Sequence, residues 1–328
     1  MDMLNIRTDL ALEARELYKQ DARQEAEVPG VEVETDGQEE LSVTRVRITS
    51  EEGSNAMGKA MGNYITIEVP GLKNKDQDLQ EDVCRVVAKE LLNVVKIGKE
   101  ATVLVVGLGN WNVTPDALGP KVISSLMVTR HLLEYVPEQI DKGVRPVCAV
   151  APGVLGLTGI ETGEIIKGIV DRLKPSLVIA IDALASRRMD RISTTIQIAD
   201  TGINPGSGVG NKRMGLTVQT LGVPVIAIGV PMVVDAATMA NDTIDLMIDA
   251  MLAQMEQGSA FYETLKNMDK NEKYTLIQQI LSPYVGNLMV TPKEIDTIIE
   301  DVSKIVANGI NIALHEGINL DDVNRYVH

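Results

Sequence analysis

The stretch Ala101-Thr-Val-Leu-Val-Val-Gly-Leu-Gly-Asn110 decides how the chain folds. Its apolar run from Val103 to Val106 predicts a β-strand over residues 102–108 that is buried on both faces. Two glycines and an asparagine end the strand, and a loop with a single carboxylate, Asp116, follows. Beyond the loop, apolar residues at helical spacing predict a helix over residues 117–134. Ligands of open α/β sheets bind beyond the carboxyl ends of strands, so Asp116 is a candidate site residue.

The alternation of apolar strands and helical patterns continues toward the carboxyl terminus. Strands are predicted over residues 147–151, 177–181, 194–198 and 223–228, and helices over residues 161–173 and 236–255. This alternation predicts right-handed crossovers and an α/β fold with a mainly parallel sheet flanked by helices.

The two ends of the chain carry different patterns. The amino-terminal part predicts helices over residues 10–24 and 78–93, and Thr8 or Asp9 is expected to cap the first of them. Between these helices, the pattern predicts a small antiparallel β insertion at about residues 31–70, with a Gly- and Met-bearing loop at 53–62. Residues 256–328 lack a strong strand pattern, and Thr291–Glu294 resembles a capping box that opens a helix. We therefore expect a helical carboxyl-terminal segment packed on the core.

Composition excludes several classes of protein. The chain has 328 residues, of which 45% are hydrophobic and 23% charged, as in globular proteins. A formal net charge of −15 argues against nucleic-acid binding, which needs basic side chains. Residues 1–8 are too polar for a signal peptide, and no apolar run reaches the roughly 18 residues of a membrane span. We expect a cytoplasmic protein in which Cys84 and Cys148 are free thiols.

Asp182 is the residue that we expect opposite Asp116. It directly follows the predicted strand at 177–181, so both acids lie at one rim of the sheet if the two strands are neighbours. Two carboxylates can divide hydrolysis between a base that activates water and an acid that protonates the leaving group. Capping of the helices after these strands is the alternative, since Asp commonly caps helices.

Other chemistries find less support in the sequence. His131, His315 and His328 do not have the spacing of a metal site, so we expect no metal or cofactor. The Gly107-Leu-Gly109 and Gly206-Ser-Gly208-Val-Gly210 patterns lack the order of a dinucleotide-binding fingerprint. Further candidates for a substrate cleft are Asn110, Glu161, Gly206, Ser207 and Gly208. The alternative for these residues is a structural role at a helix terminus or in a loop.

Several long motifs resemble those of the spore germination protease family. They are Gly107-Leu-Gly-Asn-Trp-Asn-Val-Thr-Pro-Asp-Ala-Leu-Gly-Pro120, Ala149-Val-Ala-Pro-Gly-Val-Leu-Gly-Leu-Thr-Gly-Ile-Glu-Thr162, Ile181-Asp-Ala-Leu-Ala-Ser-Arg187, Thr201-Gly-Ile-Asn-Pro-Gly-Ser-Gly-Val-Gly-Asn211 and Val290-Thr-Pro-Lys-Glu-Ile-Asp296. The resemblance implies an atypical aspartic endopeptidase of endospore-forming bacteria, without a metal, that degrades small acid-soluble spore proteins at germination. It also implies a phosphorylase/hydrolase-like fold shared with hydrogenase maturation peptidases. The family's two essential aspartates correspond to Asp116 and Asp182.

The resemblance further implies a homotetramer in the forespore or spore core, made as a zymogen. Family substrates are cut after Thr-Glu and before a bulky apolar residue, Ala, any residue and Glu. Residues 8–13, Thr-Asp-Leu-Ala-Leu-Glu, have this form with Asp in place of the first Glu. The implied processing site is therefore Asp9–Leu10, with residues 1–9 as propeptide, 10–255 as peptidase domain and 256–328 as carboxyl-terminal segment.

Two other functions compete with this expectation. One is a metal-sensing endopeptidase of the hydrogenase maturation type, whose opening motif is similar to Gly107–Asn110. The other is an α/β binding protein with an acidic rim and no catalytic activity.

Overall fold

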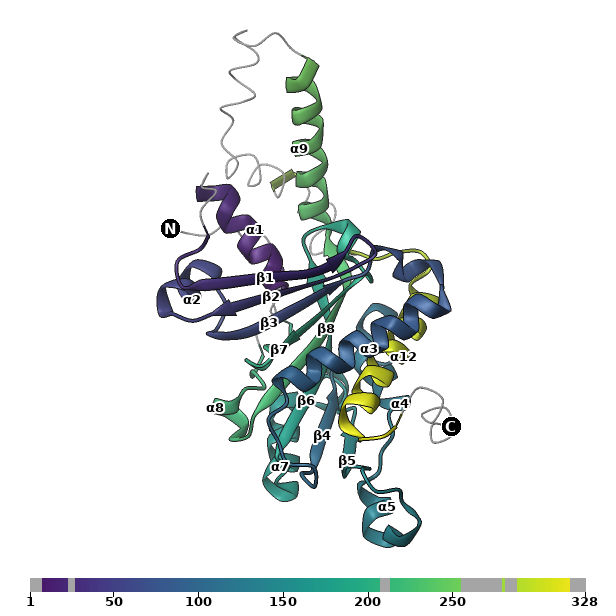
Figure 1. Cartoon of the computed structure of the whole chain (residues 1–328). Coiled ribbons are helices and arrows are strands. Elements are labelled where there is room, and N and C mark those ends of the chain that lie inside the picture. Colours follow the sequence, from purple (N-terminus) through teal and green to yellow (C-terminus); the bar gives the residue numbers. More distant parts are fainter. Residues whose placement is uncertain (1–7, 23–26, 207–212, 255–278, 281–287, 319–328) are drawn as a thin grey trace.

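This computed structural model describes residues 8–22, 27–206, 213–254, 279–280 and 288–318. Its centre is one mixed sheet with the strand order β1-β2-β3-β7-β8-β6-β4-β5, and β9 pairs with β8 (Figure 1). The strands are β1 (Val31–Gln38), β2 (Leu41–Ile48), β3 (Gly62–Glu68), β4 (Val103–Gly107), β5 (Val147–Val150), β6 (Leu177–Ser186), β7 (Thr195–Ala199), β8 (Val225–Asp235) and β9 (Met289–Val290).

The expectation of a mainly parallel sheet is wrong. Parallel pairing is confined to β4–β5, β4–β6 and β6–β8, whereas β1–β2, β2–β3, β3–β7, β7–β8 and β8–β9 pair antiparallel. Between β6 and β7 the chain makes only a short connection with a 3-10 turn at Met189–Arg191. A parallel crossover needs a dozen or more residues, so β7 returns antiparallel. Through β7, the predicted insertion of β1 to β3 becomes part of the main sheet.

Helices cover both faces of the sheet (Figure 1). The α-helices of the described residues are α1 (Ala11–Ala22), α2 (Glu51–Met57), α3 (Gln77–Val94), α4 (Leu118–Ser124), α5 (Arg130–Tyr135), α6 (Leu155–Thr158), α7 (Thr162–Leu173), α8 (Val218–Leu221), α9 (Ala236–Gln254) and α12 (Ile295–Leu314). On one face, α3, α4 and α12 pack against strand residues that include Val105 and Ile179. On the other face, α7 and α8 pack against residues that include Leu104 and Val178. This alternation explains why the strands are apolar throughout.

The helix predicted over residues 117–134 is interrupted. The chain leaves α4 after Ser124, because the Met127 amide donates to Asn311 of α12 and the Thr129 amide donates to Val147 of β5. Helix α5 then begins at Arg130. Tertiary hydrogen bonds therefore override the helical pattern.

Two other local predictions need correction. The loop predicted over residues 53–62 is partly helical, since α2 begins after Ser50, whose hydroxyl accepts the Gly53 amide at 3.1 Å. The capping box at Thr291–Glu294 does not form, because α12 begins at Ile295 and the Thr291 hydroxyl donates to the Met232 carbonyl of β8.

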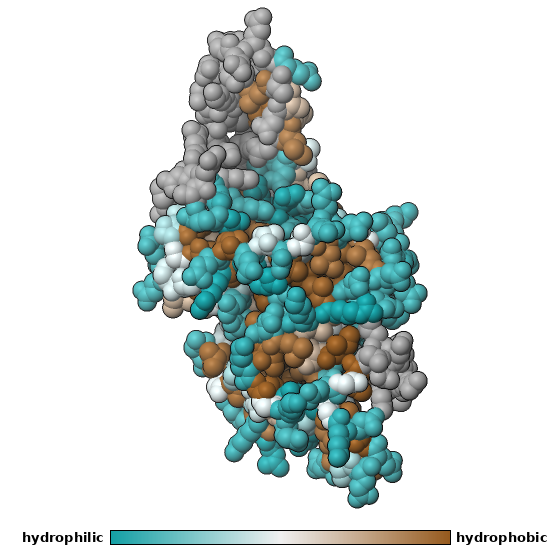
Figure 2. All heavy atoms as spheres, viewed as in Figure 1, coloured by the Kyte–Doolittle hydropathy of each residue, from teal (hydrophilic) through white to brown (hydrophobic). Residues whose placement is uncertain are grey.

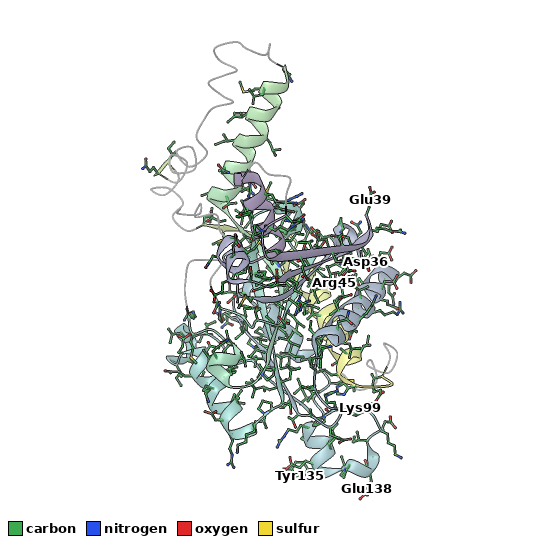
Figure 3. The ribbon with its side chains drawn as sticks, turned by 60° about the vertical axis from the view of Figure 1, so that its left-hand side comes forward. Asp36, Glu39, Arg45, Lys99, Tyr135 and Glu138 are labelled. Atoms are coloured by element: carbon green, nitrogen blue, oxygen red, sulfur yellow. The ribbon has the colours of Figure 1, made fainter. Side chains whose placement is uncertain are left out.

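One ion-pair cluster links the antiparallel edge to the helical layer. Arg45 of β2 lies 2.5 Å from Glu90 of α3 and 3.6 Å from Asp36 of β1 (Figure 3). Glu90 is 1% exposed, so this pair fixes α3 on the sheet. Within the described ranges, no helix has the length and apolar character needed to cross a bilayer.

Candidate functional site

Neighbouring parallel strands bring the two candidate aspartates to one place. β4 ends at Gly107, which pairs with Ile181 of β6, and the Leu108 amide donates to the Ile181 carbonyl at 2.8 Å. The sequence predicted that Asp182 directly follows the strand. In the structure β6 continues to Ser186, so Asp182 lies inside the strand. Asp182 is thus the first residue of β6 beyond the end of β4, beside the loop that carries Asp116.

The loop after β4 is shaped to hold the Asp116 carboxylate. Asp116 ends a 3-10 turn, and its side chain accepts the Asn110 amide at 2.9 Å. The N-cap of α4 is Ala117, so Asp116 does not cap that helix. Asp182 lies within a strand, and the capping alternative therefore fails for both residues.

Gly109 permits this loop. Its φ is +112°, and an added Cβ would lie 1.9 Å from the Asp116 carbonyl oxygen. We expect Gly109→Ala to displace Asp116 and, with Asp116 in the catalytic role that the resemblance implies, to lower peptide-bond cleavage about 100-fold, since displacements of 1 Å in an active site have effects of that size. Cleavage rates of Gly109→Ala and of Gly156→Ala measure this, because Gly156 has open space around it. Equal rates would show that the loop tolerates the change.

The two carboxyl groups differ in how firmly they hold a proton. Burial raises the pKa of Asp182 well above its ordinary value, and the negative charges of Asp116 and Asp9 raise it further. Burial also raises the pKa of Asp116, but the Asn110 amide and the positive charge of Arg213 oppose the shift. Burial and neighbouring negative charge therefore favour the protonated form more strongly at Asp182 than at Asp116.

Residues 8–11 lie against β6 beside this pair. The Asp9 amide donates to the Ala185 carbonyl at 3.0 Å, and the Ala185 amide donates to the Asp9 carboxylate at 3.0 Å. Leu10 and Ala11 are both 0% exposed. Helix α1 begins at Ala11 rather than Leu10, and the Thr8 hydroxyl accepts the Leu10 amide. Leu10 and Ala11 are thus enclosed by the protein, whereas Thr8 and Asp9 are partly exposed.

Glu13 anchors the other end of this segment. Its carboxylate accepts the backbone amides of Arg187 at 2.7 Å and Arg188 at 3.0 Å and lies 3.4 Å from the Arg191 guanidinium. The Thr8 hydroxyl donates to the same carboxylate. Glu13 is 1% exposed, so a buried acid is fully surrounded by donors.

The carbonyl of Asp9 has two donors that the sequence did not suggest. Lys59 Nζ donates to it at 2.8 Å and Gln197 Nε2 at 3.2 Å. Gln197 Oε1 also accepts the Ala11 amide at 2.7 Å. Gln197 is a polar residue in the apolar strand predicted over 194–198, and this pattern could have indicated a functional side chain. Nothing in the sequence distinguished Lys59 from the other lysines.

The remaining predicted residues lie around this centre to different degrees. Glu161 precedes α7 and lies 3.8 Å from Arg213, whose charge also reaches Asp116. Gly206 has a φ of +73°, and Ser207 and Gly208 lie outside the described residues. Within the described residues, no three acidic, His or Cys side chains form a group that could hold a metal ion.

Comparison with known proteins identifies the family. A family model described as germination protease matches residues 11–266 and 249–327. A germination protease of Caldanaerobacter subterraneus subsp. tengcongensis is 57% identical over 326 residues, covering 99% of both chains. Those of Clostridium tetani and Bacillus cereus are 54% and 45% identical, over 99% of this chain and 100% and 97% of their own. The resemblance seen in the sequence is confirmed, and the chain belongs to the germination protease family of peptidases.

Proposed function

We infer that Asp116 and Asp182 are the catalytic pair of this peptidase and that its first substrate is its own Asp9–Leu10 bond. The observation that carries the inference is the position of residues 8–13. They are held by hydrogen bonds to β6 and to the turn after it, and the negative charge of Asp9 raises the pKa of Asp182. A segment that is fixed beside two unlike carboxyl groups, with residues 8–10 ahead of the first turn of α1, has the arrangement of a bound substrate.

The stronger rise of the pKa at Asp182 supports different roles for the two acids. The Asp116 carboxylate accepts a proton from a water molecule, whose oxygen attacks the carbonyl carbon of Asp9. The Asp182 carboxyl group then donates its proton to the Leu10 nitrogen as the carbon–nitrogen bond breaks. The proton on Asp116 returns to Asp182 before the next turnover.

Self-processing makes residues 1–9 a propeptide and the intact chain a zymogen. Residues 10–255 then form the peptidase domain, and residues 256–328 form the carboxyl-terminal segment. The main substrates are small acid-soluble spore proteins, degraded in the spore core during germination. This proposal is supported by the family and by the way in which Thr8, Leu10, Ala11 and Glu13 are each held, since a substrate with the same residues fits the same contacts.

The test uses the full chain and a purified small acid-soluble spore protein. Incubation over a range of pH is expected to give a new amino terminus at Leu10, followed by cleavage of the spore protein at matching sequences. Cleavage is expected to continue in a strong chelator, because the proposed chemistry uses no metal. A different new terminus would refute the proposed bond, and loss of cleavage in chelator would favour a metal-dependent mechanism.

The pH dependence of self-cleavage is expected to be bell-shaped. Activity falls in acid as Asp116 becomes protonated, and it falls in alkali as Asp182 loses its proton; both pKa values are raised. Asp9→Asn removes a negative charge that raises the pKa of Asp182, so the alkaline limb should move to lower pH. The asparagine oxygen can still accept the Ala185 amide. Rates measured from pH 4 to 9 test this, and an alkaline limb that stays in place would contradict the assignment.

We further propose that the protein is a homotetramer. Helix α9 projects from the body of the molecule (Figure 1). It exposes 68% of Leu246, 58% of Met247 and 39% of Met251, and Figure 2 shows hydrophobic atoms on this projection. Light scattering should give a tetramer for the full chain and smaller species for a Leu246→Asp, Met247→Asp variant.

A further inference from the structure

The carbonyl oxygen of Asp9 lies in a small site made by two side chains from distant parts of the chain. Lys59 Nζ donates to it at 2.8 Å and Gln197 Nε2 at 3.2 Å. This oxygen belongs to the bond proposed to be cut. Lys59 comes from the loop after α2, and Gln197 comes from the middle of β7.

The sheet places Gln197 on the same side as the candidate pair. Gln197 of β7 and Asp182 of β6 both pair with Gly229 of β8, one from each side. Residues paired across a sheet project from the same face, so Gln197 and Asp182 stand in one row with a glycine between them. The segment of residues 8–11 is held over this row, since Gln197 binds the Asp9 carbonyl and the Ala11 amide together.

The loop that carries Lys59 is itself fixed. The Lys59 amide donates to the Ser54 carbonyl at 3.2 Å, and the Ser54 hydroxyl donates to the Lys59 carbonyl at 2.7 Å. The Tyr64 hydroxyl holds the next residue, Ala60, through its carbonyl at 2.9 Å. Burial lowers the pKa of Lys59, whereas the charges of Asp9 and Glu13 raise it. An amine held in this way is a preorganised donor rather than a mobile surface group.

We propose that Lys59 and Gln197 form the oxyanion-binding site of this peptidase, a role that rests on the proposed cleavage at Asp9–Leu10. When water adds to the Asp9 carbonyl carbon, the π electrons of the carbonyl move to its oxygen, which becomes an alkoxide. Lys59 and Gln197 donate to that alkoxide, while the proton of the water is on Asp116. The alkoxide electrons then re-form the carbonyl, the carbon–nitrogen bond breaks, and the Leu10 nitrogen takes the proton of Asp182. No further reactant is needed.

The experiment measures self-cleavage of the full chain as a first-order reaction. Loss of one oxyanion donor lowers rates by about 100- to 1,000-fold in other hydrolases, and we expect a loss of this size in Lys59→Met. Lys59→Arg should recover part of the rate because it keeps a charged donor. Lys73→Met, which changes an exposed lysine, should cleave as the unaltered chain does.

A second measurement separates catalysis from simple docking of the segment. Hydrogen exchange of the Asp9 and Ala11 amides, followed in an Asp116→Asn background so that the bond stays intact, reports whether residues 8–13 remain bound. We expect both amides to stay protected in Lys59→Met. Gln197→Glu keeps the acceptor for Ala11 and loses the donor to Asp9, so it should cleave at least about 10 times more slowly with Ala11 still protected.

Each outcome decides between the two roles. Slow cleavage with retained protection supports the oxyanion site, whereas slow cleavage with lost protection reduces Lys59 to a docking residue and overturns it. Unchanged cleavage in both variants also overturns it while leaving the proposed function intact. If the unaltered chain never forms a Leu10 terminus, both proposals fall.

Discussion

Asp182→Asn is expected to abolish peptide-bond cleavage and, at the same time, to make the folded chain more stable at neutral pH. Asparagine cannot supply the proton that the leaving nitrogen needs, and lost acid–base groups lower rates by about 10²–10⁴-fold. The stability gain comes from the burial of Asp182. Its side chain is only 7% exposed, and this burial raises the pKa of the carboxyl group. Asparagine is neutral and does not have the cost of burying a charged carboxylate, so we expect a gain of about 1–2 kcal/mol in unfolding free energy.

The pH dependence of the stability gain tests its cause. Between the ordinary pKa of an aspartate and its raised value in the fold, the folded chain holds a proton on Asp182 that the unfolded chain has lost, so the destabilisation grows as pH rises across this interval and then levels off. The advantage of Asp182→Asn should therefore disappear below about pH 3.9, the ordinary value for Asp. Urea unfolding of uncleaved chains at several pH values measures this. Asp171→Asn, an exposed change on α7, is the matched control, and an Asp182→Asn chain that cleaves at the rate of the unaltered chain would disprove the catalytic pair.

Glu13→Ala is expected to have the second large effect, on both folding and cleavage. The change leaves the amides of Arg187 and Arg188 without their acceptor and takes one partner from Arg191, which is 6% exposed. Removal of one partner from a buried ion pair typically costs about 3–5 kcal/mol. Because Glu13 also fixes the register of residues 8–11, we expect self-cleavage to slow about 100-fold.

Two further variants show which property of Glu13 matters. Glu13→Gln keeps the shape and one oxygen acceptor, so its losses should fall between those of the unaltered chain and those of Glu13→Ala. Glu16→Ala removes a different partner of Arg191 at 2.6 Å and leaves the two backbone amides satisfied. Unfolding is measured in an Asp116→Asn background, which keeps every chain intact. If Glu16→Ala slows cleavage as much as Glu13→Ala, the anchor is the arginine rather than the glutamate.

The candidate pair was predictable because it depends on two uninterrupted apolar strands. Residues 102–108 and 177–181 are each recognisable as buried parallel strands, and the residues directly after such strands share one edge of a sheet. The length of β6 was missed, since Ala183 to Ser186 continue the strand with small residues that carry no clear pattern. Asp182 was nonetheless assigned to the correct rim.

The surroundings of the pair were not predictable for a physical reason. Lys59 and Gln197 bind the Asp9 carbonyl although they lie 50 and 188 residues away from Asp9 in the sequence. The pairing of β3 with β7 brings the elements that carry them together. Apolar periodicity identifies a strand but does not give its direction or its neighbour. The antiparallel return of β7 depends on the short connection after β6, which the periodicity of the strands does not describe.

The complete burial of Leu10 affects the two new chain ends that a cut at Asp9–Leu10 creates. An amide bond is neutral, whereas its hydrolysis leaves a new carboxylate on Asp9 and a new ammonium group on Leu10. Leu10 is 0% exposed and stands next to a carboxyl pair, so the new charges arise where water is scarce. Lys59 and Gln197, which donate to the Asp9 carbonyl, would face the new carboxylate, whereas the new ammonium group of Leu10 would be buried at a cost of several kcal/mol. We therefore expect the proposed cut to loosen residues 10–13 from the sheet and to give other chains access to the candidate pair.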